Sequence, residues 1–194
     1  ILRGLVGSEM CIRDRGVAAL LPSSSGPMVI EGEGGHVSFA PRDEGERNIL
    51  TALATEFGHV SAERVVSGPG LEAIYKTSND ARLAAPEIGD GALAGDNKCV
   101  KAVNLMLKSF ATVVANAALS FGAGSGIVIA GGVVPRLRDL LDQSGFYERL
   151  EDHGRRSEFL AKLPIYLAID RFAGLRGAAI ASCSSQLQSR IIRC

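Results

Sequence analysis

The sequence has no net charge, since its 194 residues carry 21 Lys and Arg against 21 Asp and Glu. A balanced chain gives no electrostatic reason to expect nucleic acid or an anionic membrane surface as a partner. A long hydrophobic run is also missing, because the strongest apolar stretch, GIVIAGGVV, is far too short to span a bilayer. With 46% hydrophobic and 22% charged residues, the composition is typical of a soluble globular protein.

Cysteine is scarce and shows no metal-binding or disulfide pattern. The four cysteines, Cys11, Cys99, Cys183 and Cys194, have no CxxC spacing. Reduced thiols in a cytoplasmic protein are the simplest interpretation. Cys99 falls within an apolar helical pattern, where a buried inert thiol is commoner than a nucleophile. The sequence also lacks a Ser-His-Asp arrangement with a nucleophile elbow and any metal-ligand spacing.

The ends of the chain lack the patterns of a folded segment. The first residue is Ile1 rather than Met, so we expect the chain to be part of a longer one. Residues 1–15, ILRGLVGSEMCIRDR, have no signal-peptide pattern, fit neither the helical nor the strand period, and resemble translated sequencing-adapter DNA. We therefore predict that residues 1–15 are not native, and leave them out of the fold assignment. The tail at 183–194 invites the same interpretation on weaker grounds.

The remaining residues alternate between strand and helix patterns. Apolar or β-branched runs predict strands at 16–21, 28–30, 127–130 and 164–169, the last two fully buried. Helical spacing and caps predict helices at 43–58, 98–121, 136–143, 157–163 and 174–187, with two short pieces within 59–78 and a loop with at most one short helix at 80–97. The first two strands form a hairpin, and later strands alternate with helices. We therefore predict an α/β layer around a mixed, largely parallel sheet.

Glycines and ionisable residues are concentrated in GEGGH at residues 32–36. Glycine allows positive φ and a close approach of the backbone to a ligand. Glu33 offers acceptors, whereas a neutral His36 both donates and accepts, which suits the vicinal hydroxyls of a sugar. A polar turn with solvated side chains explains the same residues equally well. From the residues alone, both interpretations stay open.

The segment GHVSAER contains Glu63, two residues after the candidate helix cap Ser61. An acid in the first turn of a helix is stabilised by the helix dipole, so Glu63 needs no ligand to explain it. On composition, this structural role is favoured over a binding role. We assign no function to Arg64, and expect His59 to be structural and His153 to lie on the surface.

Glycines also surround the strand IVIA, but they form no known phosphate-binding fingerprint. Gly122 and Gly124 precede this strand, whereas the glycines of a Rossmann fold follow one, and the lysine of a P-loop is absent. Gly131 and Gly132 follow the strand and lead toward a predicted helix. A nucleotide can lie against such a backbone, although a tight turn explains these glycines as well.

Taken in order, five segments resemble those of bacterial glucokinases, the ATP-dependent sugar kinases of the hexokinase–actin superfamily. They are GEGGHVSFAP, GHVSAERVVSGPGL, IAGGVVPR, SGFYERLEDHGR and PIYLAID, and the resemblance covers about residues 16 to 180. It implies an α/β, actin-like ATPase (ribonuclease H-like) fold with a mixed sheet flanked by helices. Residues 16–182 would be the larger, C-terminal domain of a two-domain kinase.

The resemblance implies a role for each candidate residue. The D-glucose hydroxyls would be bound by Glu33, His36 and Glu63. The adenosine-binding segment would include Gly131 and Gly132, with Val133 to Arg136 nearby, and Gly16 would be the last glycine of a phosphate loop. The implied reaction transfers the γ-phosphoryl group of ATP to the 6-hydroxyl of glucose with Mg²⁺, as the first step of glycolysis in the cytoplasm. Dimers are usual in this family.

Two elements of the family's active site have no counterpart in this sequence. The catalytic Asp, which accepts the hydroxyl proton, belongs to the family's N-terminal portion, and the phosphate loop retains only Gly16. Because phosphoryl transfer needs base, metal and phosphate contacts together, we expect this chain to be inactive alone. A sugar-sensing transcriptional regulator and a kinase for another hexose are the alternatives that the same fold leaves open.

Overall fold

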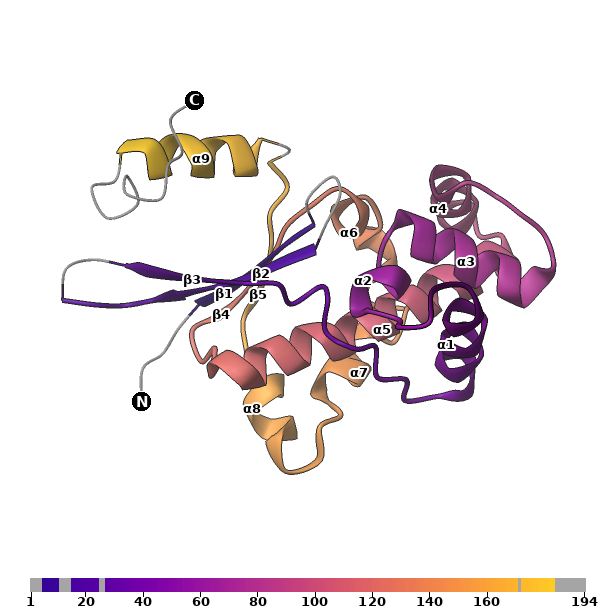
Figure 1. Cartoon of the computed structure of the whole chain (residues 1–194), viewed down its shortest axis with the longest axis horizontal. Coiled ribbons are helices and arrows are strands. Elements are labelled where there is room, and N and C mark those ends of the chain that lie inside the picture. The colour runs from indigo at the N-terminus through magenta and orange to yellow at the C-terminus, as the bar shows by residue number, and fades with distance from the viewer. Residues whose placement is uncertain (1–4, 11–14, 25–26, 171, 184–194) are drawn as a thin grey trace.

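Five short strands form one mixed sheet at one end of the chain's computed structural model, which describes residues 5–10, 15–24, 27–170 and 172–183 (Figure 1). The strand order is β3-β2-β1-β4-β5. Neighbouring pairs β1–β2 and β2–β3 are antiparallel, while β1–β4 and β4–β5 are parallel. The strands are β1 (Leu5–Met10), β2 (Arg15–Leu21), β3 (Met28–Gly32), β4 (Gly126–Ile129) and β5 (Ile165–Leu167). The predicted mixed sheet and the hairpin of β2 and β3 are confirmed, but the sheet is not largely parallel, since two of its four pairings are antiparallel.

Strand β1 lies within the segment 1–15, which the sequence analysis left out of the fold assignment. It occupies the centre of the sheet, where Leu5 pairs with Leu20 of β2 on one side and with Gly126 of β4 on the other. A central strand is held by backbone hydrogen bonds along both edges. A segment without a clear side-chain period can therefore still complete a sheet. The foreign origin of residues 1–15 stays a prediction.

The helices surround one long helix, α5, which runs beneath the sheet and through the helical half of the domain (Figure 1). Asp96 caps α5 by accepting hydrogen bonds from the Lys98 and Cys99 N–H groups, and left-handed Gly122 ends it. Helices α3, α4 and α7 pack against α5. The described helices are α1 (Glu44–Phe57), α2 (Ala62–Val65), α3 (Gly68–Asn79), α4 (Ala85–Leu93), α5 (Asn97–Phe121), α6 (Val133–Arg136), α7 (Phe146–Glu151), α8 (Ser157–Ala161) and α9 (Ala173–Cys183).

Helix α5 supplies much of the hydrophobic core. Its residues Val103, Met106, Leu107 and Phe110 are 0–2% exposed, as the predicted apolar stripe requires. Among the described residues, α5 is the one helix whose length and apolar composition would let it cross a bilayer. Within the domain, however, 67% of that apolar stretch is buried against other elements. This burial is what a core helix requires.

The segment after β4 differs from its prediction as one amphipathic helix at 136–143. Helix α6 ends at Arg136, and Leu137 leaves the helical region at φ −97° and ψ 12° before a 3₁₀ turn at Arg138–Leu140. Leu137, Leu140 and Leu141 are all buried. Their helix-like spacing is therefore satisfied by successive short turns. Helix α7, which was not predicted, follows these turns.

Two elements at the sheet end of the domain are more exposed than their patterns indicated. Strand β5 was predicted to be fully buried, but it lies at the sheet edge and Tyr166 is 54% exposed. Helix α9 overlaps the predicted range 174–187, of which 184–187 lie outside the described residues, yet Leu175 and Ile180 are 75% and 72% exposed. The apolar runs thus predicted where both elements lie in the sequence, but not how exposed their side chains are.

Candidate functional site

The loop after β3 and the segment before α2 are joined by backbone hydrogen bonds. Phe39 N–H donates to the Val60 carbonyl at 2.9 Å, and Ala62 N–H donates to the Val37 carbonyl at 2.8 Å. Glu63 N–H donates to the Gly35 carbonyl at 3.0 Å. These bonds bring the GEGGH and SAER motifs together, although α1 separates them in the sequence.

The paired segments place three ionisable side chains in one cluster, hereafter the Glu33–His36–Glu63 cluster. His36 Nε2 lies 4.0 Å from Glu33 Oε2 and 3.9 Å from Glu63 Oε2. Both distances exceed a hydrogen bond, so His36 Nε2 lies beside both carboxylates without a direct hydrogen bond to either. The Glu33 side chain is 81% exposed, His36 54% and Glu63 20%. The cluster therefore opens to solvent on the Glu33 side and reaches into the protein at Glu63.

Glu63 has both the structural role and a feature that this role does not explain. It lies in the first turn of α2, whose cap Ser61 accepts a hydrogen bond from Arg64 N–H at 3.4 Å. Yet Glu63 Oε2 is buried and accepts no hydrogen bond within the described part of the chain. A buried carboxylate oxygen without a donor is costly. Stabilisation by the helix dipole, the favoured explanation of Glu63, is therefore incomplete.

Gly34 lets the loop lie directly on β2. A Cβ atom at Gly34 would come 2.3 Å from Val17 Cγ2, which is closer than side chains can approach. Val17 is itself buried at 4% exposure and follows Gly16 in the strand. Close packing, rather than an unusual φ, therefore explains why this position is glycine. It also puts the loop beside β2, whose second residue is Gly16, the candidate phosphate-loop residue.

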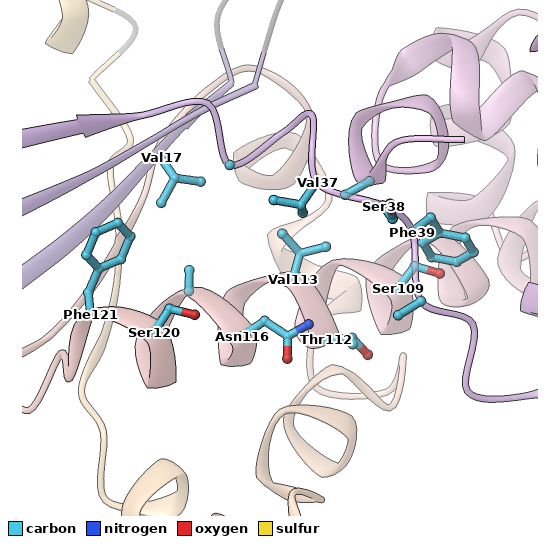
Figure 2. A pocket seen from close by; sticks show the side chains of 14 residues that line it. Val17, Val37, Ser38, Phe39, Ser109, Thr112, Val113, Asn116, Ser120 and Phe121 are labelled. Carbon is cyan, nitrogen blue, oxygen red and sulfur yellow. The ribbon is translucent and has the colours of Figure 1, made fainter. Parts of the chain in front are cut away.

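A cavity of about 250 Å³ lies behind the same loop (Figure 2). Gly34 and residues 37–40 form one wall, and the face of α5 from Ser109 to Phe121 forms the other. The lining is mainly apolar, with Ser109, Thr112, Asn116 and Ser120 as its polar members on α5. None of the three clustered ionisable residues lines it. The chemistry suited to sugar hydroxyls thus lies in the cluster and not in this cavity.

The glycine turn after β4 has the open backbone that was predicted for a nucleotide contact. Gly131 has φ +118° and both glycines are exposed. No atom lies within 4 Å of a Cβ built on Gly132. Arg136, at the end of α6, forms a 2.7 Å ion pair with Asp90 of α4 and ties the turn to the helical half. The turn follows the carboxyl end of β4, the side on which α/β sheets bind ligands.

The other candidates have structural surroundings. Nε2 of exposed His59 lies 3.1 Å from Ser38 Oγ. His153 was expected on the surface but is half-buried, and burial together with Arg42 lowers its pKa. Cys99 is buried, and burial together with Asp96 raises the pKa of its thiol to about 11, which confirms an inert thiol. Among the described residues, no group of three or more His, Cys, Asp or Glu side chains forms a metal site.

A buried charge network was not predicted. Glu46 of α1 is 0% exposed, and its carboxylate accepts hydrogen bonds from Arg42 N–H at 2.6 Å, Arg149 at 2.8 Å and Ser109 Oγ at 3.1 Å. Arg149 also pairs with Asp43 at 2.6 Å. The acidic first turn of α1 was visible in the sequence. Arg149, the partner of Glu46 on α7, lies 103 residues away in the sequence and was not predicted.

Comparison with known proteins places this geometry in context. The glucokinase family model matches residues 15–185. Glucokinase from Chromobacterium violaceum is 40% identical over 171 residues, which are 84% of this chain and 49% of that protein. The crystal structure of glucokinase from an Antarctic psychrotroph has a TM-score of 0.79 and 30% sequence identity to this chain. The match covers 92% of this chain and 56% of the psychrotroph protein. The chain thus spans about half the length of the curated relatives it matches.

A more distant solved structure has the same fold. The ROK family glucokinase from Streptomyces griseus, a complex with glucose and AMPPNP, is 17% identical with a TM-score of 0.50. The match covers 92% of this chain and 60% of the Streptomyces griseus protein. These solved neighbours are sugar kinases, and the predicted actin-like ATPase fold is confirmed.

Proposed function

Since this chain belongs to the glucokinase family, we propose that the protein of which it forms part phosphorylates D-glucose with ATP. The 6-hydroxyl receives the γ-phosphoryl group, and the products are glucose 6-phosphate and ADP. The observation that carries the proposal is the Glu33–His36–Glu63 cluster, in which a buried Glu63 oxygen lacks a donor within the described chain. We extend the proposal to a cytoplasmic enzyme of glycolysis, with a homodimer as its assembly.

The sugar is bound by the three clustered side chains. A glucose hydroxyl donates to Glu63 Oε2 and so supplies the hydrogen bond that this buried oxygen lacks. Glu33 accepts from a second hydroxyl at the exposed side of the cluster. His36 lies about equally far from both carboxylates, so its ring can donate to or accept from the same molecule. The glucose in the Streptomyces griseus complex supports this ligand class.

The nucleotide contacts the glycine backbone. The open surface at Gly132 and the exposed Gly131 fit a planar adenosine lying against the turn after β4. Gly16, at the start of β2, contributes backbone beside the phosphates. The AMPPNP in the same Streptomyces griseus complex supports ATP as the phosphoryl donor.

Mg²⁺ fits this part of the protein as a companion of ATP rather than as a separately held ion. The described residues form no cluster of His, Cys, Asp and Glu that would cage it. Mg²⁺ usually binds through substrate phosphates and water with few protein ligands. It would supply neutralisation of the charge that develops on the phosphates. The chain's own residues bind and orient the sugar.

The chain alone is proposed to bind glucose but not to turn it over. Several described aspartates are committed elsewhere: Asp43 pairs with Arg149, Asp90 with Arg136 and Asp152 with Arg42. Removing a general base costs about 10²–10⁴-fold in rate. In a coupled assay for glucose 6-phosphate, the 194-residue chain should therefore fall at least 100-fold below full-length Chromobacterium violaceum glucokinase. Turnover equal to that of the full-length enzyme would refute this proposal.

The identity of the ligand is tested by calorimetry on the same chain. Glucose should bind more tightly than galactose or mannose. A preference for another hexose would assign the site to a different sugar kinase, and no binding of any of the three would count against the cluster as a sugar site. A sugar-sensing regulator is disfavoured by the 40% identity to a glucokinase over 84% of the chain.

A further inference from the structure

The loop that carries the sugar-site residues is only partly supported by side-chain packing. The cavity of about 250 Å³ separates residues 37–40 from the face of α5 below them (Figure 2). On this loop, Phe39 is buried at 7% exposure and packs in the core, whereas Val37 is 55% exposed. A gap on one side removes the dispersion contacts that normally hold a segment in place. Hydrogen bonds must therefore provide much of what fixes the loop.

Those hydrogen bonds lie in the middle of the loop and at its C-terminal end. In the middle, the backbone pairs with residues 60–63 through Phe39, Ala62 and Glu63 N–H. At the end, the Arg42 N–H donates to Glu46 Oε2 at 2.6 Å. The other oxygen of Glu46 accepts from Ser109, a residue that also lines the cavity. The carboxylate of Glu46 thus ties the end of the loop to α5 across the edge of the gap.

Glu46 keeps this position because Arg149 pairs with it. The Glu46 carboxylate is fully buried, and a buried charge without a partner is strongly destabilising. The Arg149 guanidinium places one nitrogen 2.8 Å from Glu46 and another 2.6 Å from Asp43, so it bridges both acids at the start of α1. Its own side chain is only 12% exposed.

The ionisation of this network agrees with its geometry. Burial acts to raise the pKa of Asp43, but the hydrogen bond from Glu46 N–H and the pairing with Arg149 outweigh it and lower that pKa. Burial acts to lower the pKa of Arg149, but Glu46 and Asp43 outweigh it and raise that pKa. Both groups are therefore charged at neutral pH.

We propose that Arg149 is a positioning residue for the sugar site: by bridging Glu46 and Asp43 it fixes the end of the loop that presents Glu33 and His36. The inference rests on the proposed function and extends it to a side chain on α7 that is not one of the clustered sugar-site residues. Without Arg149, the unpaired Glu46 turns toward water and releases the Arg42 N–H. The loop then loses its anchor on the side where the cavity gives it no packing.

A purely structural role for Arg149, joining α7 to α1, predicts something different. It would lower the stability of the whole domain without acting on the loop in particular. The decisive measurement is amide hydrogen exchange on the whole chain, comparing the Phe39, Ala62 and Glu63 amides with the amide of Val103 in the core of α5. The test variant is Arg149→Met, and the matched control is Arg138→Met, an exposed arginine whose ion pair is with its neighbour Asp139.

We expect Arg149→Met to speed exchange at the three loop amides at least tenfold more than it speeds exchange at the core amide. Glucose affinity measured by calorimetry should fall five- to tenfold. Arg149→Lys keeps a cation and offers a second variant if Arg149→Met prevents folding. Its loop-amide exchange and glucose affinity should lie between those of the parent chain and Arg149→Met. Glu46→Gln combined with Arg149→Met removes both buried charges and should recover most of the loop protection. Arg138→Met should match the parent chain in both measurements.

Equal acceleration of loop and core amides in Arg149→Met, or unchanged loop exchange, would overturn the positioning role. The positioning role would also be overturned if Arg138→Met accelerated exchange at the loop amides as much as Arg149→Met does. If the parent chain binds no glucose, the proposed function fails. The exchange result still decides whether Arg149 positions the loop, so the two failures are distinguishable.

Discussion

The two sides of the proposed active site are built differently. On the sugar side, the loop is held by three backbone hydrogen bonds to residues 60–63, by close packing of Gly34 on Val17, and by the buried Glu46–Arg149 pair. On the nucleotide side, Gly131 and Gly132 are exposed with open space around Gly132, and the ion pair between Arg136 and Asp90 is half-exposed. One side presents side chains that must be oriented, and the other presents backbone.

The difference follows from what each ligand requires. Carboxylates recognise hydroxyls only when their oxygens are held in place, so a sugar site depends on a rigid loop. A backbone surface needs only to be accessible and free of side chains, so a glycine turn suffices. We therefore expect substitutions on the sugar side to have larger effects than matched substitutions on the nucleotide side.

The largest expected effect comes from Glu63. Glu63→Gln keeps the shape but removes the charge from the buried acceptor, and a hydrogen bond to a charged group contributes about 1.5–3 kcal/mol. Glucose affinity should therefore fall roughly 10- to 100-fold by calorimetry, since each 1.4 kcal/mol is about tenfold. Glu56→Gln, on the exposed face of α1, is the matched control and should bind as the parent does. Equal losses in both variants would contradict a specific role for Glu63.

The next effect tests the packing of the loop on β2. Gly34→Ala places a methyl group against Val17, and such overpacking costs about 1–3 kcal/mol in the free energy of unfolding. Urea denaturation should show this loss. Gly132→Ala is the matched control on the nucleotide side, where space is open, and should cost less. Val17→Ala combined with Gly34→Ala should recover part of the loss, whereas a Gly34→Ala chain as stable as the parent would refute the steric argument.

A smaller effect concerns acid pH and again separates the two sides. The pKa of Asp43 is lowered in the folded protein, so its stabilisation is present above the unfolded value and is lost as pH falls through the folded value. Asp43→Asn keeps a side chain that can cap α1 but no longer titrates. Its free energy of unfolding should decline less between pH 5 and pH 2 than that of the parent. Identical acid profiles would show that Asp43 does not contribute.

The smallest effect is expected from Arg136→Met. This substitution breaks a half-exposed ion pair with Asp90, and exposed pairs contribute about 0–1 kcal/mol. The melting temperature should fall by only a few degrees, and glucose affinity should not change. A loss of glucose affinity as large as that of Glu63→Gln would remove the distinction between the two sides.

The sequence predicted the parts of the fold that depend on local patterns. Helix α1 follows from its apolar spacing, its acidic first turn and Gly58, and α5 follows from its long stripe. The sequence failed for β1, whose place depends on pairing with strands distant in the chain, and for the turns after β4, where leucines at helical spacing reach the core without a helix. In both cases, tertiary contacts outweigh local preference.

The candidate site was predicted less completely, for a related reason. The residue types drew attention to Glu33, His36 and Glu63, but only the backbone pairing of two distant segments brings them together. The missing donor at Glu63 is a property of packing, which no motif contains. The roles of these residues and of Gly16, Gly131 and Gly132 remain proposals to be tested as above.

The exposed apolar surface near α9 has a practical consequence for these measurements. Ile169, Phe172, Leu175 and Ile180 are 50–75% exposed, and α9 stands clear of the other helices (Figure 1). Dyes that fluoresce on apolar surfaces should therefore bind the native chain and report no transition specific to unfolding. The sequence contains no tryptophan, so intrinsic emission comes from three tyrosines alone. Far-ultraviolet circular dichroism, dominated by the helices around α5, is the signal that follows the fold.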